Sequence, residues 1–338
     1  MKWWGWGDEN VSFTHEGKPE LAPFIERALG LDVRRPGTSA IAFEDLEIPA
    51  TALPAGLRAE LEDAVGAEHV STDDRDRVVH GRGKSLTDLI RQRRGDLGRL
   101  PDVVVHPGAE DQVAAIVRAA LEEDAVVIPF GGGSSISGSL EAESGETRPV
   151  ISIDMGRLNR VLCVDATSQL ARAQAGVFGP DLERQLGAQG WTCGHFPDSF
   201  TYSTLGGWIA TRSSGMQSDR YGDVAELTRG LRVVTPSGVL AVRPVPSTST
   251  GPSVREMVLG SEGRLGVITE ATIHVRRVPP KRRILGYLFP TWEAGLAAMR
   301  DIAASEASPS VTRVSDAPET AFSFATRNAP TPLDRLTS

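Results

Sequence analysis

The chain has 338 residues, 40% hydrophobic and 24% charged, an ordinary globular mixture long enough for two domains or one large one. Its net charge of −8 argues against a general polyanion binder, because phosphate backbones attract basic surfaces, so we expect no nucleic-acid partner. The two cysteines, Cys163 and Cys193, form no C-x-x-C pair, and the six histidines never occur at metal-ligand spacing. We therefore expect no metal and a cytoplasmic location, with neither a secretory signal nor a membrane span.

The first 55 residues predict irregular structure, aromatic at first and then rich in proline. Trp3, Trp4 and Trp6 are too apolar for a free tail, so we expect them to pack on the surface of the main domain. Helical spacing then predicts helices over residues 57–66 and 85–95. Ser85 is expected to cap the second helix, with Asp88 three residues further on.

A βαβ pattern follows. Residues 102–107 predict a strand, 110–124 a helix and 125–130 a buried strand that runs into three consecutive glycines. The apolar face predicted for the helix consists of Val113, Ile116, Val117, Ala120 and Leu121. The glycines follow the helix instead of preceding it, their spacing is not G-x-G-x-x-G, and no lysine comes after them. The loop is therefore neither a Rossmann nor a Walker loop.

From residue 150 onward the pattern changes to short strands. The predicted elements are strands at 150–155, 160–165 and 170–177, a helix at 179–190, a hairpin at 231–243 and a strand at 266–278. The sum is an α+β fold, with a βαβ-containing lobe to about residue 155 and a mainly antiparallel lobe to about 278. Residues 284–316 predict a strand, a helix and a strand, which we interpret as the start of an incomplete α+β cap domain.

Four polar segments that contain small residues lie at the ends of these elements, at 129–135, 197–203, 211–214 and 262–268. Such loops hold phosphate, because backbone N–H groups converge on its oxygens without interference from side chains. A triple glycine alone is more often a tight turn, so the prediction depends on the joint order of the four. Together they indicate a long ligand with a diphosphate and a ring system.

Six stretches in this order carry a family resemblance. They are MKWWGWGDENVSF, DDRDRVVHGRGKSL, LPDVVVHPGAEDQV, IPFGGGSSISG, GHFPDSFTYSTLGGWIATRSSGMQSDRYGD and GSEGRLGVITEATI. The chain resembles the PCMH-type FAD-binding domain of the vanillyl-alcohol oxidase superfamily, and within it the alkyldihydroxyacetonephosphate synthase family of ether-lipid biosynthesis. The likeness covers residues 1–278 and continues to about 316. It implies a PCMH-type domain of two α+β lobes at 96–280, after an N-terminal extension with helices at 1–95 and before a truncated cap at 281–338.

The resemblance implies FAD as the cofactor. The diphosphate would lie on residues 131–135, the flavin and ribityl chain along 197–203 and 211–214, and the remaining contacts on 262–268. The implied FAD-binding residues are Pro129, Phe130, Gly131, Gly132, Gly133, Ser134, Ser135, Pro197, Asp198, Ser199, Phe200, Thr201, Tyr202, Ser203, Thr211, Arg212, Ser213, Ser214, Glu262, Gly263, Arg264, Leu265, Gly266, Val267 and Ile268. The stretch FGGGSSISG lacks the histidine that tethers the flavin in several superfamily members, and we expect His195 only to hydrogen-bond within its lobe. We therefore expect dissociable, non-covalent FAD.

The resemblance also implies a transferase reaction. Similar enzymes exchange the acyl group of acyl-dihydroxyacetone phosphate for a long-chain fatty alcohol, with no net oxidation. Arg313 aligns with an arginine that the family places beside the substrate, and the family's catalytic residues are expected beyond Ser338. Because the substrates are lipids, a peripheral membrane contact stays open, as does a homodimer.

Two other hypotheses remain at this point. One is an FAD-dependent 2-hydroxy-acid dehydrogenase or oxidase of the same superfamily. In that case lactate or glycolate would bleach the flavin. The other is a non-catalytic flavin-binding fragment, which would be yellow without turnover.

Overall fold

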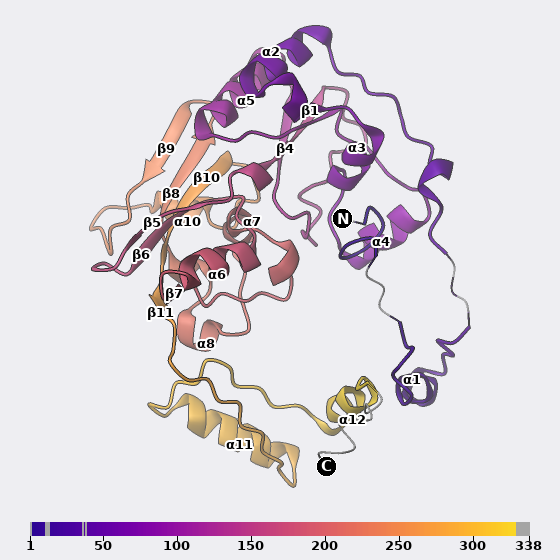
Figure 1. Cartoon of the computed structure of the whole chain (residues 1–338), viewed down its shortest axis with the longest axis vertical. Coiled ribbons are helices and arrows are strands. Elements are labelled where there is room, and N and C mark those ends of the chain that lie inside the picture. Colours follow the sequence, from indigo (N-terminus) through magenta and orange to yellow (C-terminus); the bar gives the residue numbers. More distant parts are fainter. Residues whose placement is uncertain (1, 11–13, 36, 38, 329–338) are drawn as a thin grey trace.

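The structure of the protein is a computed structural model, and it describes residues 2–10, 14–35, 37 and 39–328. Two sheets dominate it (Figure 1). The first has the strand order β1-β2-β4-β3, from β1 (Val70–Ser71), β2 (Val103–Val105), β4 (Val150–Asp154) and β3 (Val126–Phe130). Strands β2, β4 and β3 are parallel, and β1 is antiparallel to β2. The βαβ unit predicted before the glycines is confirmed.

The second sheet is wholly antiparallel, with the order β5-β6-β10-β8-β9. Its strands are β5 (Val161–Asp165), β6 (Leu170–Gln174), β10 (Val267–His274), β8 (Thr228–Thr235) and β9 (Gly238–Val242). The strand predicted over 266–278 divides in two, since β11 (Arg276–Arg277) leaves this sheet and pairs with β7 (Trp191–Thr192). The predicted mainly antiparallel second lobe is therefore confirmed.

Helices α2 (Ala55–Val65) and α5 (Glu110–Glu122) pack on the first sheet. Val113, Ile116, Val117 and Ala120 of α5 are buried as predicted, but Leu121 is 62% exposed. Leu121 lies about 80° round the helix from Val113, at the edge of the apolar stripe, so its inclusion in the buried face was wrong.

The second sheet has helices of its own. They are α6 (Gly179–Gly187), α7 (Leu205–Thr211), α8 (Ser218–Tyr221), α9 (Val224–Leu227) and α10 (Val254–Val258). Leu182 and Leu186 of α6 and Trp208 and Ile209 of α7 share one buried cluster with Ala171 of β6. This cluster holds α7, and with it the third polar segment, against the sheet.

A buried contact fixes the two lobes relative to one another. Val234 of β8 and Val267 of β10 belong to the core under α2 and α5. At the N-terminus of α5, Glu110 accepts hydrogen bonds from Arg232 of β8, at 2.9 Å from Nε, and from Thr269 of β10. The bond from Arg232 holds the pKa of Glu110 below its usual range. The link therefore joins helix α5 of one lobe to strands β8 and β10 of the other.

The N-terminal region contains α1 (Leu21–Leu29), α3 (Asp74–His80) and α4 (Leu86–Arg93). Ser85 and Asp88 form the predicted capping box at the start of α4. Trp3 is 3% exposed and meets the Phe43 ring at 6.0 Å, which confirms that the tryptophan segment packs on the domain. The prediction of irregular structure was wrong at α1, a helix whose Phe24 packs on Phe322 at 5.8 Å.

Beyond residue 278 the chain leaves the lobes. Helix α11 (Trp292–Ala303) forms as predicted, and α12 (Ala317–Ala325) lies near α1 (Figure 1). The two strands predicted on either side of α11 are wrong: no strand forms at 284–290 or at 310–316. A strand requires a hydrogen-bonding neighbour, and among the described residues these segments have none. Residues 329–338 of the expected cap lie outside the described residues.

No helix in the described part of the chain combines the length and apolarity that crossing a membrane requires.

Asp102 supports the first sheet at the end where three parallel strands begin. Its carboxylate accepts hydrogen bonds from the Val150 and Ala52 N–H groups, at 2.9 and 3.1 Å, and from Arg99 at 2.6 Å. Burial opposes ionisation, but the bonds from Arg99, Val150 and Ala52 outweigh it and hold the pKa of Asp102 below its usual range.

We predict that Asp102→Ala lowers the free energy of unfolding by about 3 kcal/mol at pH 7, because it breaks a buried ion pair. Urea denaturation measures the effect, with Asp63→Ala on the exposed face of α2 as the control. The folded pKa lies below the unfolded value of about 4, so the difference from wild type should be full at neutral pH and shrink as the pH falls below about 4. A difference that is constant down to acid pH would contradict this account.

Candidate functional site

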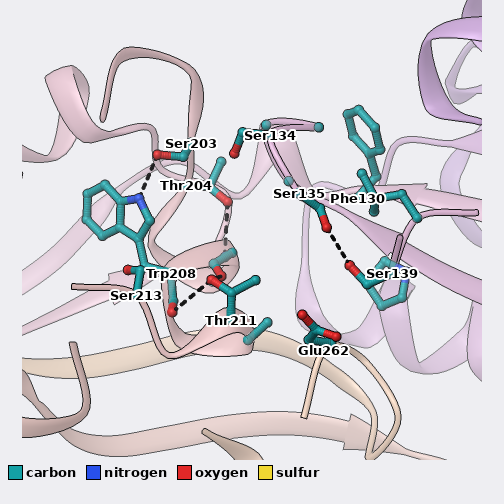
Figure 2. Close-up of a pocket in the computed structure, with 18 of the residues that line it drawn as sticks. Phe130, Ser134, Ser135, Ser139, Ser203, Thr204, Trp208, Thr211, Ser213 and Glu262 are labelled. Atoms are coloured by element: carbon teal, nitrogen blue, oxygen red, sulfur yellow. Dashed lines mark hydrogen bonds between the residues drawn. The ribbon is translucent and has the colours of Figure 1, made fainter. Parts of the chain in front are cut away.

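A pocket of about 700 Å³ lies where the two lobes meet. Its wall combines the loop after β3, the ends of β6 and β10, and α7. The volume is within the usual range for cofactor sites. Figure 2 shows hydroxyl groups from both lobes around one opening, with Trp208 on one side and Phe130 on the other.

Gly131 and Gly132, the first two of the three glycines after β3, pass directly against residues 202–204. A Cβ on Gly132 would lie 1.9 Å from the Tyr202 carbonyl oxygen, and one on Gly131 would lie 2.3 Å from Thr204 Oγ1. Gly133 has a φ of +66°, a conformation that disfavours side chains. The first two glycines are therefore required by the packing of the protein itself, in addition to any phosphate that the loop receives.

The serines after the glycines connect the first and fourth polar segments. Ser135 Oγ lies 2.8 Å from Ser139 Oγ and 3.1 Å from Ser137 Oγ, and Ser137 Oγ donates to Glu262 at 2.6 Å. A Cβ on Gly263 would lie 3.2 Å from Pro129 Cδ, so the backbone at Gly263 also passes close to the Pro129 ring. Residues 125 positions apart in the sequence thus form one rim of the pocket.

Hydrogen bonds that side chains make to one another and to the backbone fix the second and third segments. Ser203 Oγ accepts a bond from Trp208 Nε1 at 2.7 Å (Figure 2). It also donates to the Ser199 carbonyl at 2.8 Å. Thr204 caps the start of α7, accepting from the Gly207 N–H, and Thr211 near its end donates to the Gly207 carbonyl at 2.9 Å. The indole of Trp208 is therefore held as a fixed apolar wall.

All four predicted segments contribute to this pocket. The predicted residues that line it are Pro129, Phe130, Gly131, Gly132, Gly133, Ser134, Ser135, Asp198, Ser199, Ser203, Thr211, Ser213, Glu262, Gly263, Gly266 and Ile268. The predicted residues that do not line it are Pro197, Phe200, Thr201, Tyr202, Arg212, Ser214, Arg264, Leu265 and Val267. Arg212, for example, pairs with Glu256 at 2.9 Å on the surface, and Val267 faces the core. Neighbours in one segment point in different directions, so only part of each segment reaches the pocket.

Several residues that line the pocket were not predicted from the sequence. They are Trp6, Ile136, Ser137, Ser139, Leu140, Met155, Ala175, Thr204, Gly206, Gly207, Trp208 and Ala210. Thr204 and Trp208 lie in TLGGW, directly after the second predicted segment, and extending that segment by one helix would have included them. Trp6 comes from the N-terminal stretch, and its ring lies 6.3 Å from that of Tyr202. Its place in the wall depends on a long-range contact that no local pattern indicates.

The charges in the pocket match a ligand held by neutral donors. Among the described lining residues, the ionisable side chains are Asp198 and Glu262, and there is no lysine or arginine. A phosphate group in this pocket would therefore rely on backbone N–H groups and hydroxyls, which the loop at 131–135 supplies.

The structure separates Arg313 and His195 from the pocket. Arg313 is exposed and pairs with Glu319, so its substrate role stays a prediction. His195 is buried and its Nε2 lies 2.9 Å from Ser213 Oγ, which confirms the expected hydrogen bond within the lobe.

Residues 101–242 match the family model described as "FAD binding domain". This match and the two α+β lobes define a flavoprotein with the PCMH-type FAD-binding fold, and FAD is its cofactor.

The chain is, more particularly, homologous to alkyldihydroxyacetonephosphate synthases. It is 39% identical to the enzyme of that name from Dictyostelium discoideum, over all of this chain and 59% of that protein. The Caenorhabditis elegans enzyme is 36% identical over 94% of this chain and 55% of that protein. A solved alkyldihydroxyacetonephosphate synthase structure superposes with a TM-score of 0.89 at 39% identity, covering 97% of this chain and 62% of the other. The chain thus spans less than two thirds of these relatives.

We predict that Gly132→Ala lowers the affinity for FAD about fivefold or more, because a side chain forced against the Tyr202 carbonyl displaces the loop at a cost of about 1–3 kcal/mol. Titration of the apoprotein with FAD, followed by flavin fluorescence, measures the change. Gly187→Ala at the end of α6 is the control, since a Cβ there meets nothing within 4 Å. Equal affinities in the two variants would show that the close approach has no role in binding.

Proposed function

We propose that the protein is an FAD-dependent alkylglycerone-phosphate synthase of ether-lipid biosynthesis. It would exchange the acyl group of acyl-dihydroxyacetone phosphate for a long-chain fatty alcohol. The observation that carries the proposal is the 39% identity to a synthase across the whole chain, together with a pocket assembled from all four segments that the resemblance assigns to FAD.

The geometry of the pocket supports separate roles for the cofactor, which carries the reactive ring, and the protein, which binds it and excludes water. Bound FAD would supply the reactive isoalloxazine ring. Residues 131–135 would hold its diphosphate through backbone N–H groups, while Trp208, Met155 and Ile268 would exclude water from the ring. The hydroxyls of Ser203 and Thr211 already donate to backbone carbonyls, so they hold the pocket wall in place and have no proton left to donate to a ligand.

Recognition of the substrate phosphate requires a cation outside this pocket. Arg313 is our candidate, since its segment lies near the second lobe: Arg220 of α8 donates to the Ser308 carbonyl at 3.0 Å. Its present partner Glu319 would have to give way to the substrate phosphate. The cytoplasmic location, the homodimer, the peripheral membrane contact and the non-covalent attachment of FAD stay predictions.

We predict that the protein expressed from its own genomic reading frame and loaded with FAD converts acyl-dihydroxyacetone phosphate and hexadecanol into an alkyl product. Mass spectrometry of the lipid extract detects the ether. Hexadecanol labelled with ¹⁸O tests the origin of the ether oxygen, since the proposed exchange predicts that the label of the alcohol is retained in the ether.

The same preparation is offered lactate and glycolate as controls. Bleaching of the flavin by either acid, without ether formation, would replace the proposal with the 2-hydroxy-acid dehydrogenase. Full flavin occupancy with no reaction in either assay would leave a flavin-binding protein that is not an enzyme.

A further inference from the structure

A buried histidine lies directly behind one hydroxyl of the pocket wall. His195 is 1% exposed, and its Nε2 lies 2.9 Å from the Oγ of Ser213. Ser213 lines the pocket, and Figure 2 shows it beside Trp208. The His195 ring meets Trp208 edge-on, with 5.0 Å between the ring centroids. His195 thus connects the interior of the second lobe to the pocket surface without lining the pocket itself.

The surroundings of His195 determine which ring nitrogen carries the proton. Nδ1 is buried and has no hydrogen-bond partner among the described residues, whereas Nε2 faces Ser213. A buried N–H without an acceptor is rarer in proteins than a buried acceptor without a donor, so the proton belongs on Nε2. Burial also lowers the pKa of His195 to about 4, which keeps the ring neutral at pH 7 with a single N–H.

The protonation of His195 in turn sets the direction of the Ser213 hydroxyl. We propose that His195 is a positioning residue whose Nε2–H donates to Ser213 Oγ, so that the Ser213 hydroxyl proton is free to donate into the pocket, to an acceptor atom of FAD. A hydroxyl has one proton, and in this arrangement His195 does not use it. Within the described part of the chain, Ser213 Oγ has no other hydrogen-bond partner. The inference requires FAD in the pocket and is independent of the reaction that the protein catalyses.

The alternative arrangement makes a different prediction. If Ser213 donated to Nε2, the proton of His195 would lie on Nδ1, and the hydroxyl would offer the pocket only lone pairs. FAD has hydrogen-bond acceptors in its phosphates and ring carbonyls, so a hydroxyl in the pocket wall binds these atoms only if it donates its proton. Because the Nε2–H occupies one lone pair of Ser213 Oγ before FAD binds, the hydroxyl has fewer orientations to lose on binding.

The first test observes the tautomer directly. The protein is labelled with ¹⁵N-histidine, and long-range ¹H–¹⁵N NMR at pH 7 is recorded with FAD bound. We expect the His195 ring, assigned by loss of its signals in His195→Gln, to show a protonated Nε2 and an unprotonated Nδ1. A ring protonated on Nδ1, or on both nitrogens, overturns the proposal.

The second test measures FAD affinity in variants. Ser213→Ala and His195→Phe should each weaken FAD binding about 3- to 10-fold, the value of one hydrogen bond. His195→Gln, whose amide N–H can replace the Nε2–H, should stay within about twofold of wild type. His274→Gln is the matched control, since this half-buried histidine of β10 does not line the pocket.

The double variant Ser213→Ala with His195→Phe separates positioning from packing. If His195 acts through Ser213, the double variant binds FAD as weakly as Ser213→Ala alone. Losses that multiply, a His195→Gln variant as weak as His195→Phe, or a Ser213→Ala variant with wild-type affinity would each overturn the proposal. Ser213→Ala and the NMR measurement decide the matter even where His195→Phe fails to fold.

Discussion

The backbone contact between the glycine loop and the entry to α7 is the constraint on which the site depends. A side chain on Gly132 would overlap the Tyr202 carbonyl, and one on Gly206 would lie 2.8 Å from Ala175 Cβ. The Gly206 N–H also donates to the Ala175 carbonyl at 2.7 Å. The loop of the first lobe and the sheet of the second therefore meet through the same short segment, 202–206. Because no side chain separates them, amide and hydroxyl groups from both lobes face one pocket.

This arrangement requires a fixed relation between the two sheets. The core shared by Val234, Val267 and the helices α2 and α5 supplies it, because apolar burial between lobes favours one packing over many. Glu110 also fixes the orientation of the two lobes, since it can bond to Arg232 and Thr269 only when α5 lies in one position relative to β8 and β10. The first lobe thus carries the loop that we assign to the diphosphate, while the second carries the wall that we assign to the ring.

The sequence predicted the elements that have local causes. Ser85 and Asp88 predicted the start of a helix, and the change from a βαβ pattern to short strands predicted two lobes. Both signals are local, because helix capping and hydrophobic periodicity act between residues close in the sequence. It failed at residues 284–290, where an apolar run predicts a strand but no described strand lies alongside to pair with it. It also missed Trp6, whose position follows from packing near Tyr202.

What the sequence by itself determined was the set of small and hydroxyl-bearing loops, and the family resemblance that their order carries. Only the tertiary structure decided which members of each loop face the pocket. Ser213 lines it while its neighbour Ser214 lies near Ser218, and Val267 is buried in the core while the adjacent Gly266 and Ile268 reach the pocket. The physical reason is that the direction of a side chain in a loop depends on partners far away in the chain. The bond between His195 and Ser213, 18 positions apart, is one such partnership.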